Sequence, residues 1–143
     1  MSDFDDIART LRFQGGICAE MGSAFYGVFM NRIADDLEAG GPSRELAARW
    51  TGRDARALFM DAVPIRLANT FNHLAMTGEA PALSAAWPRP DAPIDAEAAW
   101  AAAREAIGPH SAALSAFLDH EPQTNEVRRS AVLLAGFLTL AAE

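Results

Sequence analysis

The residues best suited to do chemistry in this chain form one polar segment ahead of a long apolar stretch. Residues 121–130 read EPQTNEVRRS. Pro122 fixes how the chain enters, and a helix is expected to begin at about Asn125 and run to the end of the chain. Glu126 and Arg129 are three residues apart and can share one helix face. The candidate ligand-binding residues are Gln123, Thr124, Asn125, Glu126 and Arg129.

Two interpretations of this polar segment stay open. In the first, Thr124 or Asn125 caps the helix and Glu126 forms a structural ion pair with Arg129. In the second, the same polar side chains form the wall of a ligand pocket. Spacing alone favours the first interpretation.

Outside this segment, no residues have the spacing of a catalytic or metal site. The three histidines, His73, His110 and His120, form no His-x-x-x-His pair. Cys18 lies on an apolar helix face, which predicts a buried, inert thiol. All 12 basic residues are arginine, so a P-loop lysine and a Schiff-base lysine are excluded. We therefore predict no metal site, no catalytic residue and no cofactor on this chain, and leave open whether the chain is part of an enzyme.

The charge and hydropathy of the chain argue against two classes of partner. The net charge is −7, and the arginines are scattered along the sequence. Nucleic acid and anionic membranes attract basic surfaces, so we expect neither as a partner. Residues 44–55 resemble a helix-turn-helix only weakly, because the second helix would not be basic. The longest apolar stretch, residues 130–142, is shorter than the roughly 20 residues that cross a membrane. With no signal-peptide pattern at the N-terminus, a cytoplasmic protein is expected.

The composition predicts the fold class. Alanine supplies 31 of the 143 residues, whereas valine, isoleucine and threonine together supply 16. Alanine is the best helix former, and β-branched residues favour strands. We predict an all-α fold: a single-domain, orthogonal multi-helix bundle of about six to eight helices over residues 1–143, with at least 60% of the chain in helices.

Capping residues and prolines predict where the helices begin and end. Expected N-caps are Ser2, Ser23, Ser43, Asp54 and Asp95, with Ser43 opening a short helix over residues 44–50. Pro64 is expected to kink or divide the helix that Asp54 caps. Four prolines predict an irregular connection at about residues 80–94, anchored on the helices by Trp87.

Two features of the first 40 residues concern the surface of the predicted bundle. The pair Gly15-Gly16 interrupts a helix, and indicates either a close helix crossing or backbone access for a ligand, with the crossing favoured. In the next helix, the apolar stripe places Asp35, Asp36 and Glu38 on the solvent side.

The expected last helix is apolar on every face. Such a helix must be covered on every face, and the other short helices cover it in the simplest alternative. Otherwise an apolar patch remains, which a second domain or a second copy of the chain would cover. We therefore expect residues 1–143 to be the N-terminal part of a longer protein, or to self-associate.

Several stretches of the sequence together resemble one bacterial family, the domain of unknown function 2332. The start matches through Arg12-Phe-Gln14, Cys18, Gly22-Ser23 and Tyr26. The matching continues through residues 34–42, which read ADDLEAGGP, and ends with residues 123–134, which read QTNEVRRSAVLL. Full-length relatives are about twice as long and continue into a second domain that is similar to S-adenosylmethionine-dependent methyltransferases.

This resemblance implies a division of labour rather than a reaction. The chain would be a non-catalytic accessory domain that packs on its own C-terminal, methyltransferase-like domain and partly covers the site there. The polar segment would contact a ligand at the junction, and S-adenosylmethionine would bind only when the second domain is present. The alternative is a self-contained helical interaction module that forms a homodimer.

Overall fold

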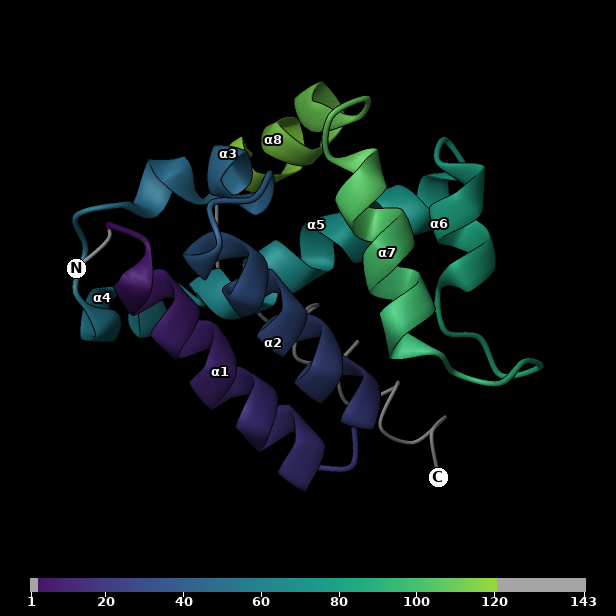
Figure 1. Ribbon diagram of the computed structural model, residues 1–143, viewed down its shortest axis with the longest axis horizontal. Helices are drawn as coiled ribbons and strands as arrows, with labels where there is room; N and C mark the ends of the chain where they lie inside the picture. Colours follow the sequence, from purple (N-terminus) through teal and green to yellow (C-terminus); the bar gives the residue numbers. More distant parts are fainter. Residues whose placement is uncertain (1–2, 121–143) are drawn as a thin grey trace.

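Helices form most of the computed structural model, which describes residues 3–120 (Figure 1). Within those residues, 73% are helical and there is no strand, which confirms the all-α multi-helix bundle. The helices are α1 (Asp5–Glu20), α2 (Ala24–Glu38), α3 (Ser43–Ala47), the 3-10 helix η1 (Ala48–Trp50), α4 (Ala55–Met60), α5 (Val63–Thr77), α6 (Pro81–Ala86), α7 (Ala96–Ala106) and α8 (Ser111–Asp119).

The first two long helices form an antiparallel hairpin at one edge of the molecule. Figure 1 shows α1 outermost, α2 beside it, and α5 passing behind α2. Helix α7 packs on the other side of α2 and against α6, while α8 packs on α5 and α3. Helix α4 packs against α1 and α5. Among the helices of residues 3–120, no other lies over the outward side of α1 (Figure 1).

Aromatic rings from four segments form the centre of the core. Phe29 of α2 contacts Phe71 of α5, Trp87 and Trp100 of α7 with ring centroids 5.1–5.7 Å apart. These pairs are edge-to-face, the arrangement that the ring quadrupoles prefer. Trp87 is buried, and its indole Nε1 donates a hydrogen bond to Asn72 Oδ1 at 2.9 Å. Trp87 therefore anchors the connection after α6, as predicted.

Most of the predicted helix boundaries are confirmed. Ser23, Asp54 and Asp95 each accept a hydrogen bond from the backbone N–H three residues on. Ala62 lies between α4 and α5 in the left-handed region, with a φ of 55°, so the predicted division near Pro64 is present. Pro64 occupies the first turn of α5, where its missing N–H leaves no helical hydrogen bond unmade.

Two boundary predictions are wrong, and one falls outside the described residues. Ser43 is the first residue of α3 rather than its cap, and its buried Oγ has no hydrogen-bond partner among residues 3–120. Residues 81–86 form α6 instead of an irregular connection, because a proline is compatible with the first helical position. Ser2 lies outside the described residues, and α1 begins at Asp5 with no side-chain cap.

The predicted solvent position of Asp36 is also wrong. Its side chain is buried, with the residue only 7% exposed. The carboxylate accepts hydrogen bonds from the backbone N–H of Ser43 at 2.8 Å and from Arg104 Nε at 2.9 Å. A Cβ on Gly41 would lie 1.9 Å from Asp36 Oδ1, so only glycine leaves room for this carboxylate. A buried charge is tolerated here because both carboxylate oxygens are paired.

No helix in the described part of the chain is long and apolar enough to cross a membrane.

Candidate functional site

The five candidate ligand-binding residues named from the sequence lie outside the described residues, as does the expected last helix. The interpretation of that polar segment therefore stays a prediction. These residues are Gln123, Thr124, Asn125, Glu126 and Arg129. Within residues 3–120, the candidate site is a surface groove between α1 and α2, which we call the hairpin groove.

The hairpin groove exists because two glycines let the backbones of α1 and α2 approach closely. A Cβ on Gly15 would lie 3.1 Å from the carbonyl oxygen of Gly27, and a Cβ on Gly27 would lie 3.1 Å from Cβ of Ala19. These distances are tighter than ordinary contacts, so a side chain at either position would push the helices apart. The predicted close crossing is therefore confirmed for Gly15. Gly16 differs, because a Cβ there would meet no atom within 4 Å.

The floor of the hairpin groove consists of small side chains, and its rim is charged. The open groove has a volume of about 530 Å³. Small residues line most of it, and Asn31 and two arginines stand at one end. The lining residues are Arg12, Gly15, Gly16, Ala19, Ala24, Gly27, Val28, Asn31 and Arg32.

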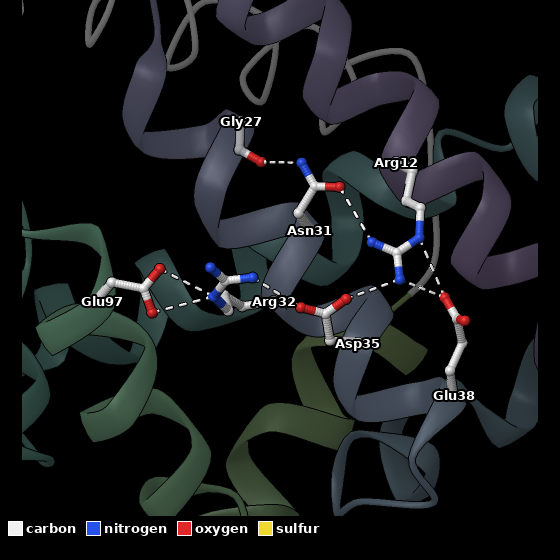
Figure 2. Close-up of polar contacts among 7 residues, drawn as sticks. All are labelled: Arg12, Gly27, Asn31, Arg32, Asp35, Glu38 and Glu97. Atoms are coloured by element: carbon white, nitrogen blue, oxygen red, sulfur yellow. Dashed lines mark hydrogen bonds and ion pairs between the residues drawn. The ribbon is translucent and has the colours of Figure 1, made fainter.

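At that end, arginines and carboxylates form one continuous network across α1, α2 and α7 (Figure 2). Arg12 donates to Asp35 Oδ1 at 2.8 Å, and it also pairs with Glu38. Arg32 bonds the other oxygen of Asp35 at 2.7 Å, and its Nε donates to both oxygens of Glu97 at 2.9 and 3.0 Å. The network thus ties the hairpin together and joins it to α7.

Asn31 joins this network to the crossing point of the hairpin. Its Oδ1 accepts a hydrogen bond from Arg12 at 3.3 Å, and its Nδ2 donates to the Gly27 carbonyl at 2.7 Å. Figure 2 shows the amide between Gly27 and the Arg12 guanidinium. Both ends of the amide are therefore occupied by groups of the chain itself.

The pairing shifts the pKa of three groups in the network. Hydrogen bonds to Asp35 and then Glu38 raise the pKa of the Arg12 guanidinium. Hydrogen bonds to Glu97 and then Asp35 raise the pKa of Arg32. Burial acts to raise the pKa of Asp35, but the hydrogen bonds and charges of the two arginines outweigh it, and the pKa of Asp35 falls below its ordinary value. These shifts favour the charged forms of all three groups, as in a structural ion-pair network.

Cys18 and Tyr26 are buried, and His73 packs on another ring. Cys18 is buried, and burial raises the pKa of its thiol, as expected for the inert cysteine predicted from the sequence. Burial also raises the pKa of Tyr26. His73 is stacked on Phe117 with ring centroids 4.9 Å apart. In the part of the chain that the structure describes, no three histidine, cysteine or acidic residues are grouped as metal ligands.

A second surface feature lies on the opposite side of α1, facing α4. Phe13 and Phe59 meet edge-to-face with centroids 5.4 Å apart, although both rings are exposed. Together with Arg9, Thr10, Ala55 and Arg56, they line a groove of about 320 Å³. We call this feature the α1–α4 surface.

The sequence did not point to the network or to the α1–α4 surface. The spacing of Asn31, Asp35 and Glu38 on one helix face was a readable signal for part of the network. Its partners Arg12 and Glu97 come from other helices, and local spacing does not show which helices will be neighbours. Phe13 and Phe59 carried no signal, because single apolar residues are common on surfaces.

A family model decides the relationship of this chain to other proteins. The model described as "Uncharacterized protein conserved in bacteria", domain of unknown function 2332, matches residues 8–143. The chain belongs to this family. The match confirms the resemblance found in the sequence, and it covers the whole hairpin groove and the α1–α4 surface of this family member. Searches of curated proteins and of solved structures gave no match.

Proposed function

We propose that this member of the domain of unknown function 2332 family is a non-catalytic, cytoplasmic accessory domain that packs on a second domain. The observation that supports the proposal is the state of the groups around the hairpin groove. Both arginines at the groove are already paired with carboxylates of the chain, so they are not free to bind or activate a charged substrate.

The shape of the hairpin groove suits the surface of another protein domain. Its floor of glycine and alanine lets a helix or loop approach the backbone closely. The paired charges at the rim resemble the polar edge that surrounds the packed centre of many interfaces. The resemblance described above implies a methyltransferase-like partner, which this accessory domain would partly cover. In this proposal S-adenosylmethionine binds to the partner domain and not to residues 1–143.

The polar segment has a place in the same proposal. Gln123, Thr124, Asn125, Glu126 and Arg129 would contact a ligand at the junction of the two domains. Replacing Asn125 and Glu126 by alanine in the full-length protein should then weaken ligand binding or activity. If the two changes lower only the thermal stability, these residues are a helix cap and a structural ion pair.

To test this packing, a large side chain is introduced into the hairpin groove. Ala24 is exposed at the start of α2 and lines the groove, so Ala24→Phe inserts a large ring where the second domain would lie. Ala98 is exposed near the start of α7 and is not a lining residue of the groove, and Ala98→Phe is the matched control. Binding of residues 1–143 to a separately expressed methyltransferase-like domain of the family is measured by isothermal titration calorimetry.

We expect Ala24→Phe to weaken this binding by about tenfold or more, and Ala98→Phe to leave it unchanged. Equal binding by both variants would show that the hairpin groove is not the packing face. Binding of S-adenosylmethionine by residues 1–143 alone would contradict the proposed division of labour.

A second candidate function, a homodimeric interaction module, is favoured by a different observation. The α1–α4 surface exposes two aromatic rings that pack on each other but are not covered by the rest of the described chain.

A further inference from the structure

The outward face of α1 carries four residues in one row. Arg9, Phe13, Gly16 and Glu20 are spaced by four, three and four residues, so they lie above one another on the helix. All four are exposed, and the Phe13 residue is 61% exposed. In the row, a cation lies at one end, an anion lies at the other, and a large ring lies next to a glycine in the middle.

Helix α4 widens this row at the end that carries Arg9. Figure 1 shows α4 beside the first half of α1. Phe59 meets Phe13 edge-to-face, and Met60 next to it is 70% exposed. Arg56 lines the same groove as Arg9 and Phe13. The surface is therefore apolar with two arginines at one end and a glutamate at the other.

Some of the charged side chains at the two ends have no ion-pair partner within residues 3–120. Nine of the ten arginines within residues 3–120 have a hydrogen-bond or ion-pair partner, and Arg56 is the exception. Glu20 likewise has no ion pair in this part of the chain. Within residues 3–120, Arg56 and Glu20 thus lie without an ion pair at opposite ends of one exposed surface, and Arg9 beside Arg56 forms an exposed pair with Asp6 at 3.2 Å.

We propose that a second copy of this chain binds here, with the two α1 helices antiparallel about a two-fold axis. In this arrangement Arg9 of each copy lies opposite Glu20 of the other, and Phe13 lies opposite Gly16. The two-fold axis places the α4 side of one copy against the α4 side of the other, so Arg56 also approaches Glu20 of the second copy. Each contact occurs twice, as in any isologous interface.

Size and charge both favour a second copy as the occupant. The space above Gly16 is open, since a Cβ there would meet nothing within 4 Å, and it can receive the Phe13 ring of the other chain. A parallel arrangement would instead bring arginine against arginine and glutamate against glutamate. A helix of 16 residues is about 24 Å long, so the contact is small and we expect a reversible dimer in the micromolar range. This inference rests on the second candidate function and names the residues through which two copies would pair. Arg9 and Phe13 line the α1–α4 surface, whereas Gly16 also lines the hairpin groove.

A charge exchange tests the antiparallel pairing. Dissociation constants for the complete 143-residue chain are measured by sedimentation equilibrium. Arg9→Glu and Glu20→Arg each place like charges opposite one another twice, and each should weaken association by about tenfold or more. The double variant restores opposite charges between positions 9 and 20 and should associate more tightly than either single variant, by about threefold or more. Recovery stays incomplete, because Arg56 then faces an arginine at position 20. Glu105→Arg, a change of equal charge at an exposed position of α7, is the control and should leave association unchanged.

Replacing Gly16 by a larger residue separates an effect on association from an effect on folding. Gly16→Leu places its Cβ in open space and improves helix propensity, so its circular dichroism and melting temperature should not fall. The same side chain occupies the place of the incoming Phe13 ring and should abolish the dimer. A wild-type chain that stays monomeric at several hundred micromolar, a double charge variant that associates no more tightly than either single variant, or a Gly16→Leu chain that still dimerises would each overturn the proposal.

Discussion

The two sides of α1 use their charged residues in different ways. On the side that faces α2, Arg12 contacts two carboxylates and an amide, and the network extends through Arg32 to α7. On the side that faces α4, Arg56 has no partner within the described residues, and Phe13 and Phe59 are exposed. The first side is complete within one chain and supports the fold. The second leaves charge and apolar surface for another molecule.

Changes on the complete side should therefore lower stability, and changes on the α1–α4 surface should lower association. The largest expected loss of stability comes from displacing the buried carboxylate of Asp36, which is not part of the network. Gly41→Ala places a Cβ 1.9 Å from Asp36 Oδ1, which must displace a paired, buried charge. We expect the free energy of unfolding to fall by about 3 kcal/mol, measured by urea denaturation.

Gly108→Ala is the matched control for that change. A Cβ on Gly108 has open space and its φ is not positive, so stability should change by less than about 0.5 kcal/mol. Equal effects of the two variants would mean that Asp36 is not held as described.

The helix crossing gives the next largest effect. Gly27→Ala adds a Cβ 3.1 Å from Ala19 Cβ and 3.2 Å from the Gly15 carbonyl oxygen. Separating two packed helices should lower the free energy of unfolding by about 1–2 kcal/mol. Gly16→Ala on the open side of α1 should raise it, by up to about 1 kcal/mol, because alanine is the better helix former. A stabilising Gly27→Ala would show that the hairpin is not limited by this contact.

The exposed network should contribute a smaller, pH-dependent amount. The pKa of Asp35 is lower in the folded state, so its contribution is present above its ordinary pKa of 3.8 and is lost as the pH falls below that value. Because Asp35 and its partners are partly exposed, we expect no more than about 1 kcal/mol. In the Asp35→Asn variant, the free energy of unfolding should therefore fall less between pH 5 and pH 3 than it does in wild type. High salt should reduce this difference. Identical pH profiles for wild type and variant would exclude this role.

The sequence predicted the local features of the fold and missed the tertiary ones. The caps at Ser23, Asp54 and Asp95 depend on a hydrogen bond three residues away, so they could be read directly. Asp36 could not, because its partners Ser43 and Arg104 lie seven and 68 residues away. Arg66 was missed for the same reason: it is buried, and it donates to Asp61 and to the carbonyl of Leu118.

The candidate sites show the same limit. The polar segment at residues 123–129 is still a prediction, since it lies outside the described residues. The Gly15-Gly16 pair indicated a close crossing, but only the structure distinguishes Gly15 at the crossing from Gly16 on the open face. That difference depends on where α2 lies, and the spacing of residues along α1 does not show this.

The smallest expected effect on stability is at Phe13, where the same change should clearly weaken association. Phe13→Gln should change the free energy of unfolding by less than about 0.5 kcal/mol, because the ring is exposed in the single chain. Met76→Gln, at a residue of α5 that is 65% exposed, is the matched control.

Sedimentation equilibrium of these two variants beside wild type tests the contrast between the two sides of α1 most directly. We predict a reversible dimer for wild type and Met76→Gln, and a dissociation constant raised by about tenfold or more for Phe13→Gln. If Phe13→Gln associates as wild type does, or if wild type shows no dimer at all, the α1–α4 surface is not an interface between copies of this chain.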